Sequence, residues 1–251
     1  MKNFRSALAL YTLLFLSQTA FGQGAFNSTG IGGNWNNAGS WTLTGGADGD
    51  GIPDANDNVT ILGNDIITVN VNSACTSLQI GATPATGVNP GTLNFSGAFS
   101  LTVSGAVTVG GFGNVARRGT VTFSVGSAIV AGSLTFGNAG IPAGTPNLID
   151  MTAGGTLTTG SLAVNAGPVN TWTPGAGTVE LTATNTLPAT IFTSFNNLTI
   201  NGGTTTLGVG ISIGGTLSVD AGTFNLSTFN VTSVGAVDMT GTTIKIGRAH
   251  V

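Results

Sequence analysis

The chain of 251 residues has little charge, one cysteine and few aromatic side chains. Charged residues make up 6% of it, against roughly 25% in an ordinary globular domain. Its six lysines and arginines are outnumbered by nine acidic residues, and the basic residues form no stripe. Because Lys and Arg supply most of the affinity for a phosphate backbone, we expect no nucleic-acid partner.

The single cysteine, Cys75, excludes an internal disulfide. We interpret it as a small buried apolar residue, and the alternative is a reactive thiol. No apolar run approaches the roughly 20 residues that a membrane-spanning helix needs, so we expect no membrane span. The adjacent Arg117 and Arg118 are interpreted as part of a solvated loop.

The N-terminus has the pattern of a secretory signal peptide. Lys2 and Arg5 precede an apolar stretch at residues 7–16, which is followed by small residues up to Gly22. We therefore predict that residues 1–22 are a signal peptide. The mature chain is expected to be secreted or to lie on the outer cell surface.

Residues 246–251 read Ile-Gly-Arg-Ala-His-Val, which is what a common sequencing-adapter read encodes. We interpret this segment as a sequencing artefact and assign no role to His250, and the alternative is a genuine polar tail. The reading frame is then expected to continue past Lys245.

From residue 65 onward the chain consists of short apolar–polar–apolar runs separated by Gly, Asn or Pro. Typical runs are Leu101-Thr102-Val103, Leu134-Thr135-Phe136 and Leu217-Ser218-Val219. A period of two places alternate side chains on opposite faces, so these runs predict short half-buried strands.

Strands this short bury little surface alone, and stacking equivalent strands on one another solves that problem. We therefore predict an all-β fold, a parallel β-helix or β-solenoid spanning residues 65–245, with many of the 41 glycines at its corners. The alternative is a β-sandwich, which asks for longer strands and more aromatic core residues than the 7% present here.

Residues 23–64 differ from the repeats and are predicted to form an N-terminal capping segment. Trp35 and Trp41 are expected to cover the open end of the core, where unpaired strand edges would otherwise be exposed. The alternative is an aromatic pair that stacks on a sugar.

The most distinctive segments are Thr178-Val179-Glu180-Leu181 and residues 195–203, which read Phe-Asn-Asn-Leu-Thr-Ile-Asn-Gly-Gly. With the opening Asp-Asn-Val-Thr-Ile at residues 57–61, they make the chain resemble the large extracellular β-solenoid repeat proteins of Bacteroidetes. The resemblance covers residues 30–245 and implies export by type IX secretion. It implies almost nothing about activity.

An acidic loop at residues 46–58 has the Asp-x-Asp-Gly spacing of calcium-binding loops. It is similar to the calcium-binding type 3 repeats of thrombospondins, and this similarity implies metal ligands at Asp48, Asp50, Asp54 and Asp57. The first aspartate of that pattern is replaced by Gly46. Ca²⁺ is the cofactor that the loop predicts, and the alternative is a solvated acidic turn.

The remaining carboxylates are widely spaced, and the general acid–base pairs that hydrolases and lyases need are not evident. We therefore expect no enzyme but a structural or adhesin-like surface protein, with surface glycans or a host or neighbouring cell surface as partner. The alternative is a carbohydrate-binding or carbohydrate-active protein whose catalytic part is missing downstream. A third hypothesis is ice binding through outward threonine rows.

Overall fold

We describe the fold from a computed structural model of the chain. The structure describes residues 22–82, 89–111, 118–137, 146–165, 170–233, 235–239 and 243–245. The predicted signal peptide up to residue 21, Arg117 and the segment 246–251 lie outside the described residues.

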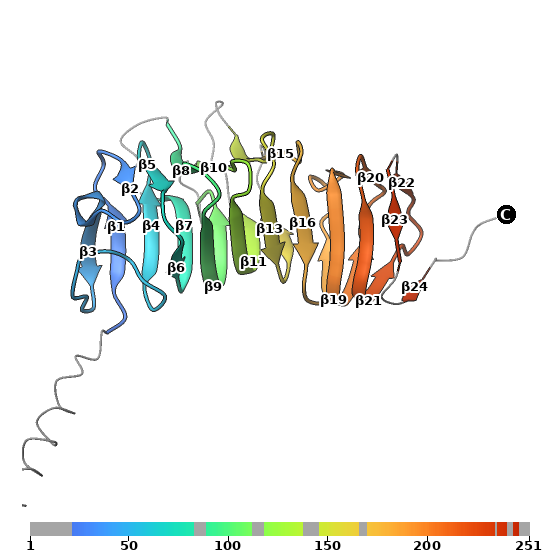
Figure 1. Cartoon of the computed structure of the whole chain (residues 1–251), viewed down its shortest axis with the longest axis horizontal. Helices are drawn as coiled ribbons and strands as arrows, with labels where there is room; N and C mark the ends of the chain where they lie inside the picture. The colour runs from blue at the N-terminus through green and yellow to red at the C-terminus, as the bar shows by residue number, and fades with distance from the viewer. Residues whose placement is uncertain are drawn as a thin grey trace, which may run out of the picture.

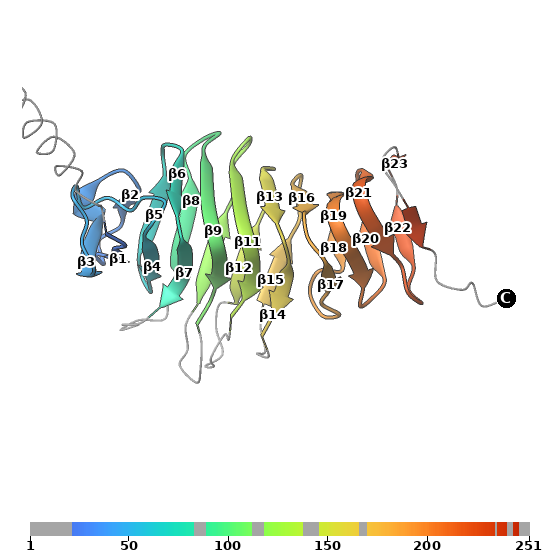
Figure 2. The ribbon, with the colours of Figure 1, turned by 90° about the horizontal axis from the view of Figure 1, so that it is seen from below.

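The described chain is all β, as predicted, apart from one short 3-10 helix at Ala38–Ser40. Its strands form sheets of 15, 6 and 3 strands. Of the strand pairs in the described residues, only β1 (Ala25–Ser28) with β3 (Trp41–Gly45) is antiparallel. Figures 1 and 2 show the strands side by side along the long axis, from the N-terminal end in blue to the C-terminal end in red.

The strands stack on one another in three series, and we call each series of strands paired in this way a column. Four long strands contribute their first halves to column 1 and their second halves to column 2: β9 (Ser100–Val109), β11 (Ala128–Phe136), β19 (Asn197–Leu207) and β21 (Leu217–Asn225). Column 1 holds their first halves with β6 (Ser73–Cys75), β13 (Thr156–Thr159), β16 (Thr178–Leu181) and β23 (Val237–Asp238). Column 2 holds their second halves with β1, β4 (Asn58–Leu62), β7 (Ser77–Ala82), β14 (Leu162–Val164), β17 (Asn185–Leu187) and β24 (Thr243–Lys245).

Column 3 holds the remaining strands: β2 (Gly33–Asn34), β5 (Ile66–Val69), β8 (Gly91–Phe95), β10 (Gly119–Thr122), β12 (Asn147–Asp150), β15 (Asn170–Thr173), β18 (Ser194–Phe195), β20 (Ile211–Ile213) and β22 (Val231–Ser233). From β8 onward the chain passes through columns 3, 1 and 2 in that order, again and again. One such passage is called a circuit below. The mostly parallel sheets and this winding are consistent with a β-helix-like fold.

The register is kept from one circuit to the next. In column 1 Leu101 pairs with Ile129 and Ile129 with Leu157, two intervals of 28 residues (129 − 101 and 157 − 129). Later circuits are shorter, because Val179 pairs with Leu198 after 19 residues (198 − 179). Equivalent side chains therefore lie above one another along the stack.

The core is built from the inward positions of all three columns. Strand β8 shows the pattern, because Gly91, Leu93 and Phe95 are buried while Thr92 and Asn94 are half-buried. Burial of each Leu, Ile or Val side chain stabilises the fold by roughly 1.5–3 kcal/mol relative to exposure. Stacking thus supplies the apolar burial that single short strands lack.

Glycine is required where circuits pass closest to each other. A Cβ on Gly119 would lie 2.6 Å from both the backbone N of Gly110 and the backbone O of Ile80. Gly222 has a φ of +87°, and a Cβ there would collide with the backbone O of Gly203. These positions exclude any side chain, in agreement with the predicted role of glycine at corners.

Stacking already includes strands before residue 65. β1 and β4 pair in column 2, and β2 pairs with β5 in column 3. The antiparallel strand β3 then covers the outer edge of β1 and ends the 15-stranded sheet.

Candidate functional site

In the acidic loop, all four predicted calcium ligands accept hydrogen bonds from backbone amides of the loop, and three of them accept from residues two or three positions further along the chain. Asp48 Oδ2 accepts from the N–H groups of Asp50 and Gly51. Asp50 Oδ1 accepts from Ile52 N–H at 2.9 Å, and Asp54 Oδ1 accepts from the second residue after it at 2.8 Å. These bonds shape the loop and use one carboxylate oxygen of each of the three side chains.

The fourth predicted ligand, Asp57, is placed differently from the other three. Its side chain is 1% exposed, and its two oxygens accept from Gly24 N–H at 2.6 Å and from Asp54 N–H at 2.7 Å. Asp57 therefore joins the start of the described chain to the first residues of β4. Both of its oxygens already have backbone donors.

A second buried carboxylate, Asp65, has the same arrangement. It is 0% exposed and accepts from the backbone N–H groups of Gly30 and Gly32. In the sequence, Asp65 is one of the widely spaced carboxylates outside the acidic loop, and its spacing predicts no role for it. The signal that could have singled it out is position, because Asp57 and Asp65 each directly precede a strand whose inward residues are Val or Ile.

Within the described ranges, no group of three or more His, Cys, Asp or Glu side chains is arranged to hold a metal ion. Asp50 and Asp54 are exposed and Asp48 is half-buried, while Asp57 is buried. Calcium binding by these four residues stays a prediction.

The two N-terminal tryptophans lie inside the core. Trp35 and Trp41 are 1% and 6% exposed, and their rings meet edge to face with centroids 5.1 Å apart. Trp41 Nε1 donates to Trp35 O at 2.7 Å, and Trp35 Nε1 donates to Pro53 O at 3.3 Å. Because both rings are buried, neither offers an exposed face on which a sugar could stack.

The Cys75 thiol is buried in column 1, next to Val103 of the following circuit. Burial, and secondly the negative charge of Asp57, raise the pKa of this thiol to about 12. Since the thiolate is the reactive form, almost none is present at neutral pH. The geometry agrees with a packed apolar residue rather than a reactive thiol.

Arg118 is buried, with 9% exposure, so its interpretation as part of a solvated loop is wrong. Its backbone O accepts from Gly91 N–H at 2.9 Å, at the start of a strand in column 3. Arg118 directly precedes strand β10, and its backbone hydrogen bond holds it within the stack. Composition alone does not reveal this burial. Arg117 lies outside the described residues.

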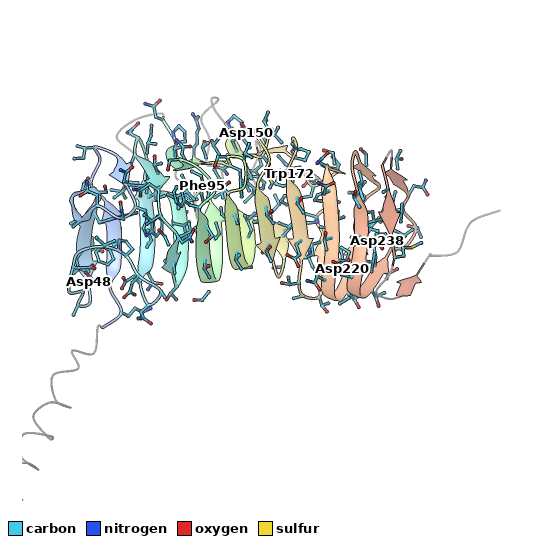
Figure 3. The ribbon with its side chains drawn as sticks, in the orientation of Figure 1. Asp48, Phe95, Asp150, Trp172, Asp220 and Asp238 are labelled. Carbon is cyan, nitrogen blue, oxygen red and sulfur yellow. The ribbon has the colours of Figure 1, made fainter. Side chains whose placement is uncertain are left out.

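The carboxylates outside the acidic loop are dispersed along the stack. Figure 3 shows Asp48 at one end, Asp150 on the upper edge, and Asp220 and Asp238 towards the other end. Glu180 lies on the outer face of column 1, where it accepts from Thr158 Oγ1 at 2.9 Å and from Asn201 Nδ2 at 2.5 Å. Glu180 therefore links polar side chains of the two neighbouring strands on the outer face of column 1.

Comparison with known proteins adds no family to this description. No family model, no curated protein and no solved structure matches the chain. Among the residues that the structure describes, no helix has the length and hydropathy that crossing a bilayer requires.

Proposed function

We propose that the chain forms a parallel β-solenoid that acts as a non-enzymatic structural or adhesin-like protein, secreted or held on the outer cell surface. The observation that carries this proposal is the constant register of the stack. In column 1 the inward positions Cys75, Val103 and Ala131 are aligned across three circuits, and the alignment continues to Val219. A stack of this kind lengthens by whole circuits without changing its cross-section, which suits a stalk or a display surface.

The outer face of column 1 supports the same proposal. Successive strands place Thr102, Val130, Thr158, Glu180, Thr199 and Ser218 at equivalent outward positions, and four of these six side chains carry a hydroxyl group. Hydroxyl groups are the commonest polar groups in this row, and they offer donors and acceptors to a polar partner. Surface glycans or a host or neighbouring cell surface are the proposed partners.

Deletion of one whole circuit tests the solenoid. Removing residues 101–128 joins Ser100 to Ile129, and every remaining column strand then meets an equivalent partner. We expect a folded protein that is shorter by one strand spacing, about 4.8 Å, with unchanged β circular dichroism per residue. Small-angle scattering measures the length.

The matched control is removal of residues 101–114, half of that interval, which puts column strands out of register and should prevent folding. Equal tolerance of both deletions would sink the solenoid proposal. The surface role is tested by antibody binding to intact producing cells. Saturable binding of one class of sugar on a glycan array would favour the carbohydrate-binding alternative.

Calcium binding by the acidic loop is part of the same proposal. At a hundredfold excess over Kd, a bound ion stabilises the folded state by about 2.7 kcal/mol, so Ca²⁺ should raise the melting temperature above that in chelator. Asp50→Asn keeps an oxygen for Ile52 N–H but removes a charge, and it should abolish this rise while leaving the melting temperature in chelator unchanged. Identical melting curves of the unaltered chain with Ca²⁺ and with chelator would contradict calcium binding.

A further inference from the structure

Among the described residues, only one of the three columns is joined by strand pairing along its whole length. Column 1 is paired without interruption from β6 to β23. In the described residues, no strand pairing joins β14 to β17 in column 2, and none joins β15 to β18 in column 3. Column 3 is accordingly divided into the 6-stranded and 3-stranded sheets.

Both interruptions border the same circuit, made of β15, β16 and β17 at residues 170–187, which we call the junction circuit. The interruption of column 2 lies on the N-terminal side of the junction circuit, and the interruption of column 3 lies on the C-terminal side of that circuit. Column 1 alone is continuous through both steps, by the pairs of β13 with β16 and of β16 with β19. We call the passage from one circuit to the next a step. Every other step between β8 and β21 has strand pairing in all three columns.

The interruptions coincide with a change in circuit length. The interval between paired residues in column 1 is 28 up to Leu157, 22 from Leu157 to Val179 (179 − 157) and 19 from Val179 to Leu198. A shorter circuit cannot follow the outline of a longer one on all three sides. Column 1 keeps its register, so the mismatch falls on columns 2 and 3.

Side chains fill the step where column 3 is interrupted. The ring of Trp172 on β15 meets Phe192 edge to face at 5.2 Å and Phe195 on β18 at 6.0 Å. Trp172 Nε1 donates to Ser194 O at 2.7 Å. At this step of column 3, aromatic packing and one side-chain hydrogen bond therefore replace the backbone hydrogen bonds that join the strands at the other steps.

Of the five buried side-chain polar atoms without a hydrogen-bond partner in the described residues, three lie around the junction circuit and two, in Ser40 and Asn70, lie near the N-terminal end. Within the described chain, the buried Nδ2 atoms of Asn170 on β15 and Asn185 on β17 have no hydrogen-bond partner, nor does Oγ1 of Thr205, which is paired with Asn185. This inward polar pair is followed by Phe224 on the next strand, and inward positions earlier in column 2 are apolar, such as Val107, Leu134 and Leu162. Tight closure of this region is therefore less favourable than at the other steps.

We infer that the junction circuit is a hinge, at which the two halves of the stack bend about column 1 while columns 2 and 3 open and close. At each of the two steps that border the junction circuit only one of columns 2 and 3 is paired, so opening both columns there breaks one backbone ladder, whereas at every other step between β8 and β21 it would break two. The inference rests on the proposed solenoid. It makes the protein two stiff segments joined at residues 170–187 instead of one stiff rod, which would let a surface-anchored stalk reorient its outer segment.

Distances between paired spin labels test the hinge. The control pair Asn34→Cys with Asp150→Cys spans four paired steps of column 3, and the junction pair Thr122→Cys with Ser212→Cys spans four steps that include the interruption. Both separations are about 19 Å for strands stacked at about 4.8 Å. Native Cys75 is buried and stays unlabelled.

We expect the distance distribution of the junction pair to be at least twofold wider than that of the control pair. Equal widths would overturn the hinge and leave the solenoid standing. A control pair far from about 19 Å would instead contradict the solenoid itself.

Trp172→Ala gives an independent check. Removing the ring should widen the distribution of the junction pair further and leave the control pair unchanged, and Trp172→Phe should have a smaller effect because a ring remains. A junction distribution that Trp172→Ala leaves unchanged would show that the aromatic cluster does not restrain this step. Widening of both pairs would report general loss of structure and count against a local hinge.

Discussion

Replacing Leu101 with alanine is expected to lower the free energy of unfolding by about 2–5 kcal/mol. Leu101 is 0% exposed and lies in column 1 next to Ile129 of the following circuit. The loss combines the transfer free energy of the removed methyl groups with the cost of a cavity that the rigid stack cannot fill. Urea denaturation followed by circular dichroism measures it.

The neighbouring residue provides the matched control. Thr102 follows Leu101 on the same strand but points outward and is exposed. Thr102→Ala should change the free energy of unfolding by no more than about 0.5 kcal/mol. Comparable losses from the two substitutions would mean that the strand does not alternate between core and solvent, and the stacked arrangement would lose its main support.

The fluorescence of the three tryptophans adds a regional readout to this pair. Trp35 and Trp41 report the N-terminal end of the stack, and Trp172 reports the junction circuit. Because each circuit contacts only its neighbours, a defect at Leu101 is expected to affect the N-terminal segment first. Separate transitions by fluorescence and circular dichroism would then be observed.

The strands themselves could be predicted from the sequence because each carries its own signal. Leu101-Thr102-Val103 alternates apolar and polar residues, and its structure is a strand with Leu101 and Val103 buried. The preference for stacking followed from the same fact, since a strand with two inward side chains cannot bury enough surface alone.

The circuits could not be predicted, because the same tripeptide pattern occurs in every column. The motif Gly-Thr-Leu at residues 91–93 lies in column 3, whereas its copies at 155–157 and 215–217 lie at the start of column 1 strands. Similar segments therefore do not mark equivalent positions. Circuit length, and with it the junction, depends on the corners between strands, where the sequence has no fixed pattern.

The acidic residues show a comparable limit. Spacing alone grouped Asp57 with Asp48, Asp50 and Asp54 as one set of ligands, but the structure buries Asp57 against backbone amides. Asp65 received no role from the sequence, although it has the same environment. Burial depends on which distant segment packs over a side chain, and the covering segment here begins more than 30 residues earlier in the chain.

Replacing Asp57 with alanine is therefore expected to destabilise the N-terminal end of the stack strongly. The substitution leaves the N–H groups of Gly24 and Asp54 without their acceptor, and hydrogen bonds to a charged group contribute about 1.5–3 kcal/mol each. Removing a buried charge recovers some desolvation cost, so we expect a net loss of about 2–4 kcal/mol. Urea denaturation followed by Trp35 and Trp41 fluorescence measures the loss.

Asp50→Ala is the matched control, because Asp50 is exposed and accepts only from the nearby Ile52 N–H among the bonds described. It should cost no more than about 0.5 kcal/mol in chelator. If Asp57→Ala were as mild as Asp50→Ala under those conditions, Asp57 would not anchor the start of the chain. If instead Asp57→Ala were mild in chelator and harmful only with Ca²⁺ present, its main role would be as a metal ligand, and the buried backbone contacts would be secondary.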